Sequence, residues 1–323
     1  MDRWRLPSLW CLLIVFVLAP RVTAAQEEVR FTVTADMRHE HEAFARVLWA
    51  INGIGGPGGF HVSVGDEDDR VWENRALIDT FFGSTAVWFP IIGNHEAEDP
   101  VEMDWLREEF ATGNGERVPL SAHITGSGPA GTEATTYSWN RGRAHFIAIN
   151  EYWNGTDVPG GDVGIDGDVI PELLAWLEAD LKANTRPAVF VFGHEPAFPF
   201  HRHLDDSLNK YEGHRDAFWA LLERESVVAY ICGHTHVFSI YQHADGRVWQ
   251  IDVGNAGRDS DFLDGQTFLN VAIEGNSVRF EVCRNHDGPF TCGTGWTEKV
   301  PILFKDGFES GVTDRWSCES IDR

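Results

Sequence analysis

Basic residues are scarce in this sequence. The 323 residues include 26 Lys and Arg against 50 Asp and Glu, which gives a formal net charge of −24. A surface of that sign repels the phosphate backbone of nucleic acids and anionic membranes, so no binding to nucleic acid is expected. The charge does not exclude a small phosphate ester as substrate, because bound divalent metal ions dominate the field of their own site.

Long apolar runs are absent after residue 25. Residues 1–25 begin with the basic MDRWR, continue with the apolar LWCLLIVFVLA and end in the small residues VTAA. That is the pattern of a cleavable signal peptide, and the apolar stretch is too short for a comfortable membrane span. We therefore expect a secreted or periplasmic protein without a membrane span.

Cysteine is also rare, with five in the chain. Cys283 and Cys292 flank the turn-rich segment RNHDGPFT, and a disulfide across that hairpin is plausible in an oxidising compartment. Cys232 ends an apolar run, which predicts an inert buried thiol rather than a nucleophile.

Strand and helix patterns alternate over the first two-thirds of the chain. Helical spacing of apolar residues predicts five helices, over 39–52, 71–82, 100–110, 170–184 and 213–225. A hairpin is predicted from TTYSWN and RAHFIAIN, and after residue 236 only strands follow, the last of them in VPILF (300–304). Residues 112–133 and 153–169 look like long loops. The pattern predicts two packed mixed sheets flanked by helices.

Five apolar, β-branched runs are each followed directly by a polar cluster. The runs are VRFTVTA, FHVSV, AVWFPII, AVFVF and VVAYIC; the clusters contain Asp36, Asp66, Asn94-His95-Glu96, His194-Glu195 and His234-Thr235-His236. In open α/β sheets, functional sites lie outside the carboxyl ends of the strands. Two aspartates, an asparagine and three histidines at one edge have the chemistry of a two-metal centre.

The order of these blocks resembles the calcineurin-like metallophosphoesterases, the group that includes the purple acid phosphatases, in an exported bacterial form. GNHE and GHTH are the specific blocks, and the resemblance runs from about Val29 to Asn255. It implies an α/β fold, the αββα sandwich, in one domain over 26–304. It also implies hydrolysis of phosphoric esters, in which a hydroxide that bridges two metal ions attacks phosphorus.

The resemblance assigns the metal ligands. One metal ion takes Asp36, Asp66 and His236, and the other takes Asp66, Asn94, His194 and His234. Asp66 is the bridge, because a carboxylate has two oxygens and can bind two cations. These ligand types suit two divalent or trivalent ions, such as Mn, Fe, Zn or a mixed pair. His95 points at the substrate by the same resemblance, where it protonates the leaving oxygen or stabilises phosphoryl charge.

The first block departs from the family pattern Asp-x-His. Arg38 occupies the position of the histidine, and an arginine cannot lose its proton to bind a metal ion. Asp69, His39 or a water molecule could fill the vacant ligand position, and we favour water or Asp69. Arg38 could bind a substrate phosphate, since a guanidinium matches phosphoryl oxygens, or it could pair with Asp69.

Further residues are candidates for the rim of the site. Asn255 and Arg258 in DVGNAGR lie where the family has a glycine-rich segment and could meet a substrate anion, as could Asn94. His201, His203 and His214 follow GHEPAFPF and could form a pocket wall.

The sequence leaves three functions open. A phosphomonoesterase is favoured by the similarity to acid phosphatases, and a phosphodiesterase of the same fold is the first alternative. The third is a degenerate member that binds without catalysis, for which Arg38 is one indication. The other is the tail 305–323, which contains DGFESGVTDRWS, similar to a segment that ends many exported bacterial proteins. That tail is either a sorting or processing segment, which would allow a place at the cell surface, or a frayed terminus.

Overall fold

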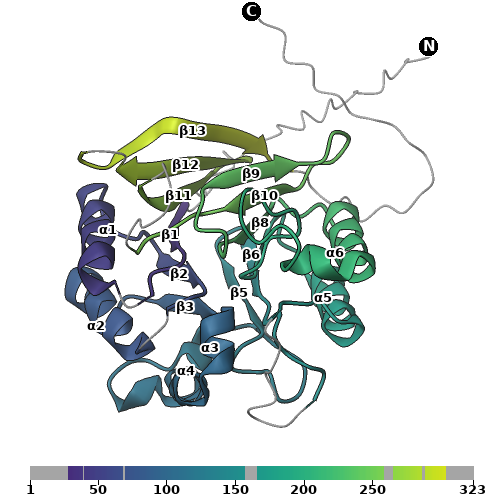
Figure 1. The fold of residues 1–323 in the computed structure, drawn as a ribbon, viewed down its shortest axis with the longest axis horizontal. Coiled ribbons are helices and arrows are strands. Elements are labelled where there is room, and N and C mark those ends of the chain that lie inside the picture. The colour runs from purple at the N-terminus through teal and green to yellow at the C-terminus, as the bar shows by residue number, and fades with distance from the viewer. Residues whose placement is uncertain are drawn as a thin grey trace, which may run out of the picture.

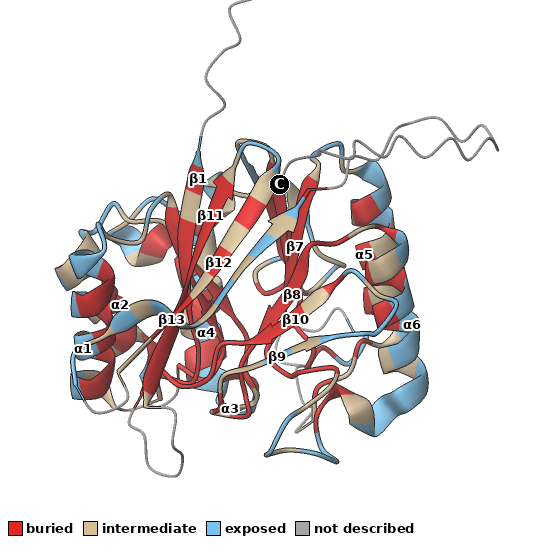
Figure 2. Cartoon of the chain, turned by 90° about the horizontal axis from the view of Figure 1, so that it is seen from above, coloured by how far each residue is buried: buried red, intermediate tan, exposed pale blue. Residues whose placement is uncertain are grey.

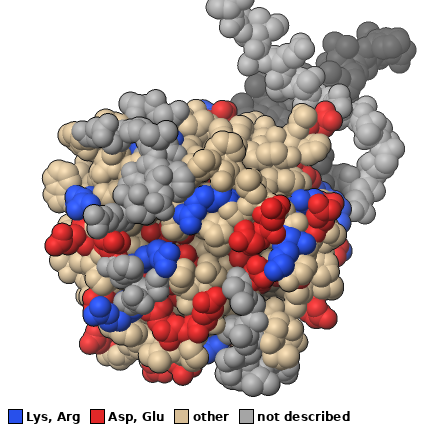
Figure 3. All heavy atoms as spheres, viewed as in Figure 1, with Lys and Arg blue, Asp and Glu red and all other residues tan. Residues whose placement is uncertain are grey.

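A computed structural model describes residues 28–38, 40–67, 70–156, 166–257, 265–285 and 288–302. The predicted signal peptide and the predicted tail lie outside these residues. None of the described helices is long and apolar enough to cross a membrane. On the face seen in Figure 3, the described basic side chains lie scattered among acidic ones.

Two mixed β-sheets pack face to face, with helices on both outer sides (Figures 1 and 2). The order of the first sheet is β13-β12-β11-β1-β2-β3 and that of the second is β4-β5-β6-β7-β8-β10-β9. Strands β1, β2 and β3 run parallel, as do β6, β7, β8 and β10. The predicted αββα sandwich is therefore confirmed.

The first sheet contains the strands from both ends of the described chain: β1 (Val29–Thr34), β2 (Phe60–Val64), β3 (Trp88–Ile91), β11 (Gln266–Glu274), β12 (Ser277–Asn285) and β13 (Thr291–Pro301). The second sheet is built from the middle of the chain: β4 (Gly126–Ser127), β5 (Tyr137–Arg141), β6 (Ala144–Ala148), β7 (Ala188–Phe192), β8 (Ala229–Cys232), β9 (Ser239–Gln242) and β10 (Trp249–Asp252). Strands β5 and β6 form the predicted hairpin.

Aromatic rings fill the space between the two sheets. Phe31 of β1 contacts Phe146 of β6 and Phe190 of β7 edge to face, with ring centroids 5.3 and 5.5 Å apart. These strands are buried over almost their whole length because each faces the other sheet on one side and helices on the other (Figure 2). The core therefore fixes the position of the carboxyl ends of the parallel strands in one sheet relative to those in the other.

Helices α1, α2 and α4 cover the first sheet, and α5 and α6 cover the second (Figure 2). The helices are α1 (His41–Gly53), α2 (Val71–Phe82), α3 (Asn94–Glu98), α4 (Pro100–Thr112), α5 (Pro171–Ala183) and α6 (Glu212–Arg224). Helix α5 shows why such segments are recognisable: proline occupies its first position, and Leu173, Leu177 and Leu181 form its buried stripe.

Two predictions about the chain path are wrong. The last strand is Thr291–Pro301 rather than 300–304, because it pairs with β12 along its length. The segment 112–133 is not a plain loop, since it contains the short 3₁₀ helices Gly113–Gly115 and Leu120–Ala122 as well as β4. A third short 3₁₀ helix, Leu208–Tyr211, precedes α6. In the other predicted loop, residues 157–165 lie outside the described chain.

The predicted disulfide between Cys283 and Cys292 is present, and it joins β12 to β13 at directly paired positions. Cys232 is a free thiol that is fully buried at the end of β8, as expected. Burial raises the pKa of this thiol well above its usual range, which disfavours the thiolate form that a nucleophile needs.

We expect His61 to make the fold sensitive to acid. This fully buried ring on β2 lies between the hydroxyls of Thr32 and Thr34, at 2.9 and 3.0 Å. Burial, and then the charge of Arg75, lower its pKa to about 3. The unfolded chain therefore binds a proton at this residue below pH about 6.5 while the folded chain does not, and stability falls as the pH drops from there towards 3.

The loss is at most about 1.4 kcal/mol per pH unit from this group. Denaturant unfolding at pH 6.5 and 4.5 should show a smaller acid-dependent loss in His61→Gln than in the natural protein. An equal loss in both would contradict this account of His61.

Candidate metal centre

The six predicted ligands meet at one edge of the sandwich. Asp36 follows β1, Asp66 follows β2, and Asn94 opens helix α3 after β3. His194 follows β7 of the second sheet, and His234 and His236 follow β8. Because both sheets present the carboxyl ends of parallel strands at this edge, ligands from distant parts of the chain come together.

Asp36, Asp66 and His236 form one group. Each offers a ligand atom, and the three atoms lie within 4.8 Å of one another. The Nε2 atom of His236 lies 3.4 Å from Oδ1 of Asp36. These are the three residues predicted for the first metal ion.

A second group lies on the other side of Asp66. Nε2 of His194 is 3.3 Å from Oδ1 of Asp66 and 3.3 Å from Nδ1 of His234. Nδ1 of His194 donates to the carbonyl of Val64 at 2.7 Å, and this bond leaves the Nε2 lone pair directed at the group. A lone pair and a carboxylate oxygen that face each other repel, unless a cation lies between them.

Three buried donor atoms of this edge have no hydrogen-bond partner among the described residues: Oδ1 of Asp36, Oδ1 of Asn94 and Nε2 of His234. An unpaired buried polar atom costs roughly 1–3 kcal/mol, so native proteins leave few of them. A bound metal ion removes that cost. The donor set of carboxylate, amide and imidazole therefore fits a metal centre.

The electrostatics of the edge lead to the same conclusion. Burial raises the pKa of Asp36 well above its usual range, and the neighbouring charge of Asp66 raises it further. Burial lowers the pKa of His194, lowers that of His234 well below its usual value, and lowers that of His236 to about 3. Burial therefore favours the neutral imidazoles, and neutral imidazoles have the free lone pair with which a metal ion is bound.

The backbone is strained at this edge. Ten non-glycine residues of the described chain have left-handed φ values, and six of them lie here: Asp36, Arg38, Asp66, His203, His234 and His236. Such conformations cost about 1–3 kcal/mol each and concentrate at functional sites. This concentration of strained backbone points to a functional site at this edge of the sandwich. It does so independently of the chemistry of the side chains.

His95 differs from the predicted ligands in its exposure. Its side chain is 29% exposed, whereas those of Asp66 and His194 are 2% and 0% exposed. Its Nε2 lies 3.7 Å from Oδ2 of Asp66, and its backbone N–H is 3.4 Å from Oδ1 of the same residue. The ring of His95 therefore borders Asp66 and still reaches solvent.

Glu96 and Glu151 hold the loops of the site, and neither was among the predicted site residues. One oxygen of Glu96 accepts the N–H groups of Gly93 and Asp66, at 2.8 and 3.0 Å. One oxygen of Glu151 accepts those of His194 and Glu195, at 3.0 and 2.7 Å. Glu151 follows strand β6, and this repetition of a carboxylate after a strand was the available signal.

We expect Gly93→Ala to disrupt the centre. A Cβ atom at Gly93 would lie 2.4 Å from both the N and Oδ1 atoms of Asp66, so Asp66 would have to move. Metal content should fall by at least one equivalent per chain, as measured by elemental analysis. Gly83→Ala serves as the control, because a Cβ there meets nothing within 4 Å and only the left-handed φ is strained. Equal metal content in both variants would show that the close approach at Gly93 is unimportant.

Arg38 lies beside the centre. Its N–H donates to the carbonyl of Asp66 at 2.9 Å, and its charge lowers the pKa of His236. Asn255 is buried, and its Oδ1 accepts the N–H of Gly257 at 2.7 Å. The N–H of Gly257 lies 3.2 Å from the carbonyl of Asp36, so this turn packs against the first ligand loop. His39, Asp69 and Arg258 lie outside the described residues.

The connection after β7 also reaches the centre. The ring of His203 lies 4.0 Å from that of His234, centroid to centroid, and the charge of Arg202 lowers the pKa of both His234 and His236. Arg202 was not a predicted site residue, and its presence between two histidines was the only signal. His214 instead contacts Asp168 at 2.8 Å, and His201 is exposed.

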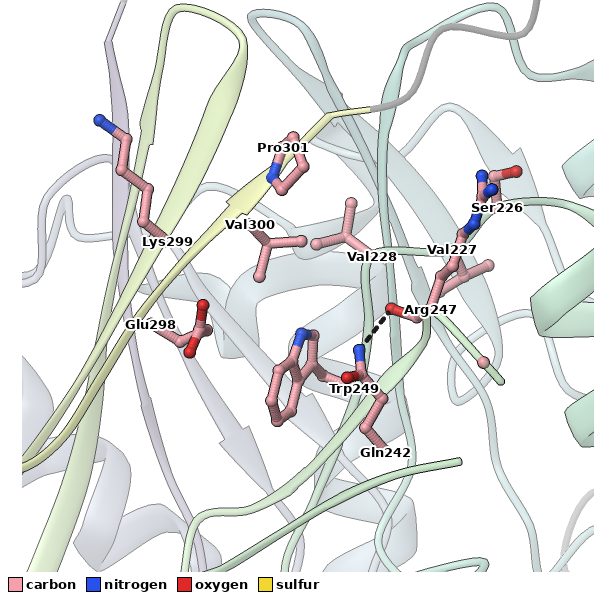
Figure 4. A pocket seen from close by; sticks show the side chains of 11 residues that line it. Ser226, Val227, Val228, Gln242, Arg247, Trp249, Glu298, Lys299, Val300 and Pro301 are labelled. Carbon is pink, nitrogen blue, oxygen red and sulfur yellow. Dashed lines mark hydrogen bonds between the residues drawn. The ribbon is translucent and has the colours of Figure 1, made fainter. Parts of the chain in front are cut away.

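A separate cavity of about 450 Å³ lies between β9, β10 and β13 (Figure 4). Val228 and Val300 point toward one another there, and Trp249 lines the floor. The cavity contains none of the predicted ligands, so it is distinct from the metal centre.

Residues 29–238 match the family model described as calcineurin-like phosphoesterase. No curated protein matches the chain.

Among solved structures, GAP50, the anchor in the inner membrane complex of Plasmodium, shares 14% identity with a TM-score of 0.58, and the match covers 85% of this chain and 89% of that one. A predicted phosphoesterase from Streptococcus pneumoniae has 11% identity and a TM-score of 0.40 over 86% of this chain and 99% of that one. Vacuolar protein sorting 29 from Cryptosporidium parvum has 10% identity and a TM-score of 0.41 over 85% and 98%. At these identities, the likeness to GAP50 is one of fold alone.

Proposed function

Because this chain belongs to the calcineurin-like phosphoesterases, we propose that it hydrolyses phosphoric esters with two metal ions bound at one edge of the sandwich, to which both sheets contribute residues. The observation that carries the proposal is the set of unpartnered buried donor atoms on Asp36, Asn94 and His234. Their arrangement around Asp66 supports one ion on each side of that carboxylate.

The residues proposed to hold the ions are Asp36, Asp66 and His236 for one and Asp66, Asn94, His194 and His234 for the other. When bound, such ions lower the pKa of a water molecule and neutralise charge that develops on the phosphoryl group. Mn, Fe, Zn or a mixed pair suit these ligands. With Arg38 in place of a histidine, water or Asp69 is proposed to complete the first site.

The chain itself supplies the remaining groups. His95 is proposed to donate a proton to the leaving oxygen, because it borders Asp66 and stays partly exposed. Arg38 is proposed to bind the phosphoryl oxygens, since its guanidinium cannot bind a metal ion and its backbone is fixed to that of Asp66. Asn255 and Arg258 are proposed to line the substrate side of the same rim.

Phosphomonoesters are the favoured substrates. A monoester carries two negative charges near neutral pH and a diester carries one, so the guanidinium groups of Arg38 and Arg202 favour the monoester. A phosphodiesterase of the same fold is the alternative within this class.

Hydrolysis by the full chain, loaded in turn with manganese, iron or zinc, tests the proposal. We expect metal-dependent turnover that is faster on p-nitrophenyl phosphate than on bis(p-nitrophenyl) phosphate and is abolished by chelation. Faster turnover of the diester would assign the phosphodiesterase instead. His234→Ala is the matched inactive control, because it removes a ligand from a buried position.

A binding protein without catalysis is the second candidate, and Arg38 at a ligand position is the observation that favours it. Absence of turnover with every metal, in a chain that still binds two ions, would select this candidate. The proposed exported location rests only on residues 1–25 and is tested by locating the protein in the cell that makes it.

A further inference from the structure

We propose that residues 200–204 form the substrate-recognition segment of this site, in which Arg202 binds the phosphoryl oxygens and Phe200 and Leu204 contact an apolar organic group of the ester. This inference rests on the proposed function and adds the substrate class: phosphomonoesters of apolar alcohols or phenols.

The position of the segment is fixed by His203. Its ring lies 4.0 Å from the ring of His234, centroid to centroid, with 38° between the planes. Arg202 is the preceding residue in the chain, and the Nη1 atom of its guanidinium is buried. The segment therefore borders a proposed ligand, beside the place where a phosphoryl group would be held.

The segment is anchored on both sides. Before it, Phe198 exchanges two hydrogen bonds with the side chain of Gln250, at 2.9 and 2.8 Å. After it, Oγ of Ser207 donates to the carbonyl of His203 at 2.9 Å, and the amide of Asn209 donates to the carbonyl of Leu204. These contacts hold both ends of the segment and so limit the directions that its tip can take.

The backbone of the tip is strained on both sides of Arg202. His201 and His203 have φ values of 72° and 53°, and the N–H of Arg202 donates to the carbonyl of Phe200 at 2.9 Å. Two left-handed residues that are not glycine, separated by one residue, persist only where surrounding contacts impose them. Here His201 and His203 turn the chain sharply around Arg202, next to the candidate metal centre.

Two large apolar side chains flank the turn and face solvent. Phe200 is 61% exposed and Leu204 is 52% exposed. A small and strongly acidic protein gains nothing in solubility from such residues, and their removal from water by a ligand is favourable. Their place on either side of Arg202 fits an ester whose phosphoryl group lies on the guanidinium and whose organic group lies against the two side chains.

The test of the apolar part compares n-hexyl phosphate with ethyl phosphate, two esters with similar leaving groups that differ only in chain length. In the natural protein loaded with manganese, we expect kcat/KM to be about tenfold higher for the hexyl ester, or more. In the double variant Phe200→Ala/Leu204→Ala the two values should become nearly equal. Val118→Ala is the control, because Val118 is also 61% exposed but borders residues that precede β3, at the opposite end of the strand.

The test of Arg202 uses both esters and inorganic phosphate. Arg202→Ala should lower kcat/KM about 10- to 100-fold for both esters without changing their ratio, and should weaken inhibition by phosphate by a similar factor. Arg202→Lys should recover part of both losses. Unchanged phosphate inhibition in Arg202→Ala would overturn the role of Arg202.

The outcomes separate this inference from the function on which it rests. If the natural protein hydrolyses both esters and the double variant keeps the hexyl-to-ethyl ratio, the recognition segment is wrong and the hydrolase stands. If the natural protein hydrolyses p-nitrophenyl phosphate but neither alkyl ester, the inference fails and the hydrolase stands. If it hydrolyses none of the three with manganese, iron or zinc, the proposed function fails, and the inference fails with it.

Discussion

Asp66→Asn is expected to lower kcat by about 10³-fold or more, because the variant loses the carboxylate proposed to serve both metal ions. An amide has one oxygen to offer, and that oxygen carries no full charge. The measurement is phosphate release from p-nitrophenyl phosphate at saturating metal. Asp104→Asn is the control, since the Asp104 side chain is 80% exposed and pairs only with Arg107 in the described contacts.

The same substitution should not unfold the protein. The backbone contacts of Asp66, from Arg38 and to Glu96, do not involve its carboxylate. Removing a buried negative charge beside Asp36 also relieves the repulsion that raises the pKa of Asp36. In the presence of a chelator the variant should be at least as stable as the natural protein by denaturant unfolding. Turnover at the natural rate in Asp66→Asn would refute the proposed mechanism.

His95→Ala is expected to have the second-largest effect. General acid catalysis by a positioned side chain contributes about 10²- to 10⁴-fold, so kcat should fall within that range. Metal content should stay unchanged, because the ring of His95 borders Asp66 without belonging to either proposed ligand set. Elemental analysis and steady-state kinetics on the same preparation measure both.

Two esters distinguish the role proposed for His95. An ester whose leaving group needs no proton, such as p-nitrophenolate, should lose less kcat in His95→Ala. An ester with an alkoxide leaving group should lose more. Loss of metal from the variant would instead make His95 a ligand or a structural residue. An equal loss of kcat on both esters would assign it to charge stabilisation on the phosphoryl group.

Much of the fold could be predicted because its periodic signals are strong. The helix expected over 71–82 is present at those bounds, and α5 begins at the expected proline. The last strand was misplaced because TCGTGWTEKVP contains two glycines and few apolar residues. Its strand conformation comes from pairing with β12, including a register shift opposite 281–283, and such tertiary context overrides weak local propensity.

The residues that meet at the candidate metal centre could be predicted because each of them follows a recognisable strand. The supporting groups could not, because their roles depend on folding contacts across the chain: Glu151 supports His194 from a position 43 residues away. The left-handed backbone at Asp36, Asp66 and His234 likewise leaves no pattern in the sequence, since aspartate and histidine are ordinary residues in other conformations. The ring of His203, next to Arg202, reaches that of His234 only through the path of a loop.

Metal content per chain tests the central claim most directly. Full-length protein, purified without chelators and reloaded with manganese, iron or zinc, should bind two equivalents as measured by elemental analysis. His194→Ala should lose at least one of them, whereas His214→Ala, whose ring contacts Asp168 outside the proposed ligand set, should keep both. One equivalent or none under every loading condition would contradict the two-metal centre and favour a binding protein without catalysis.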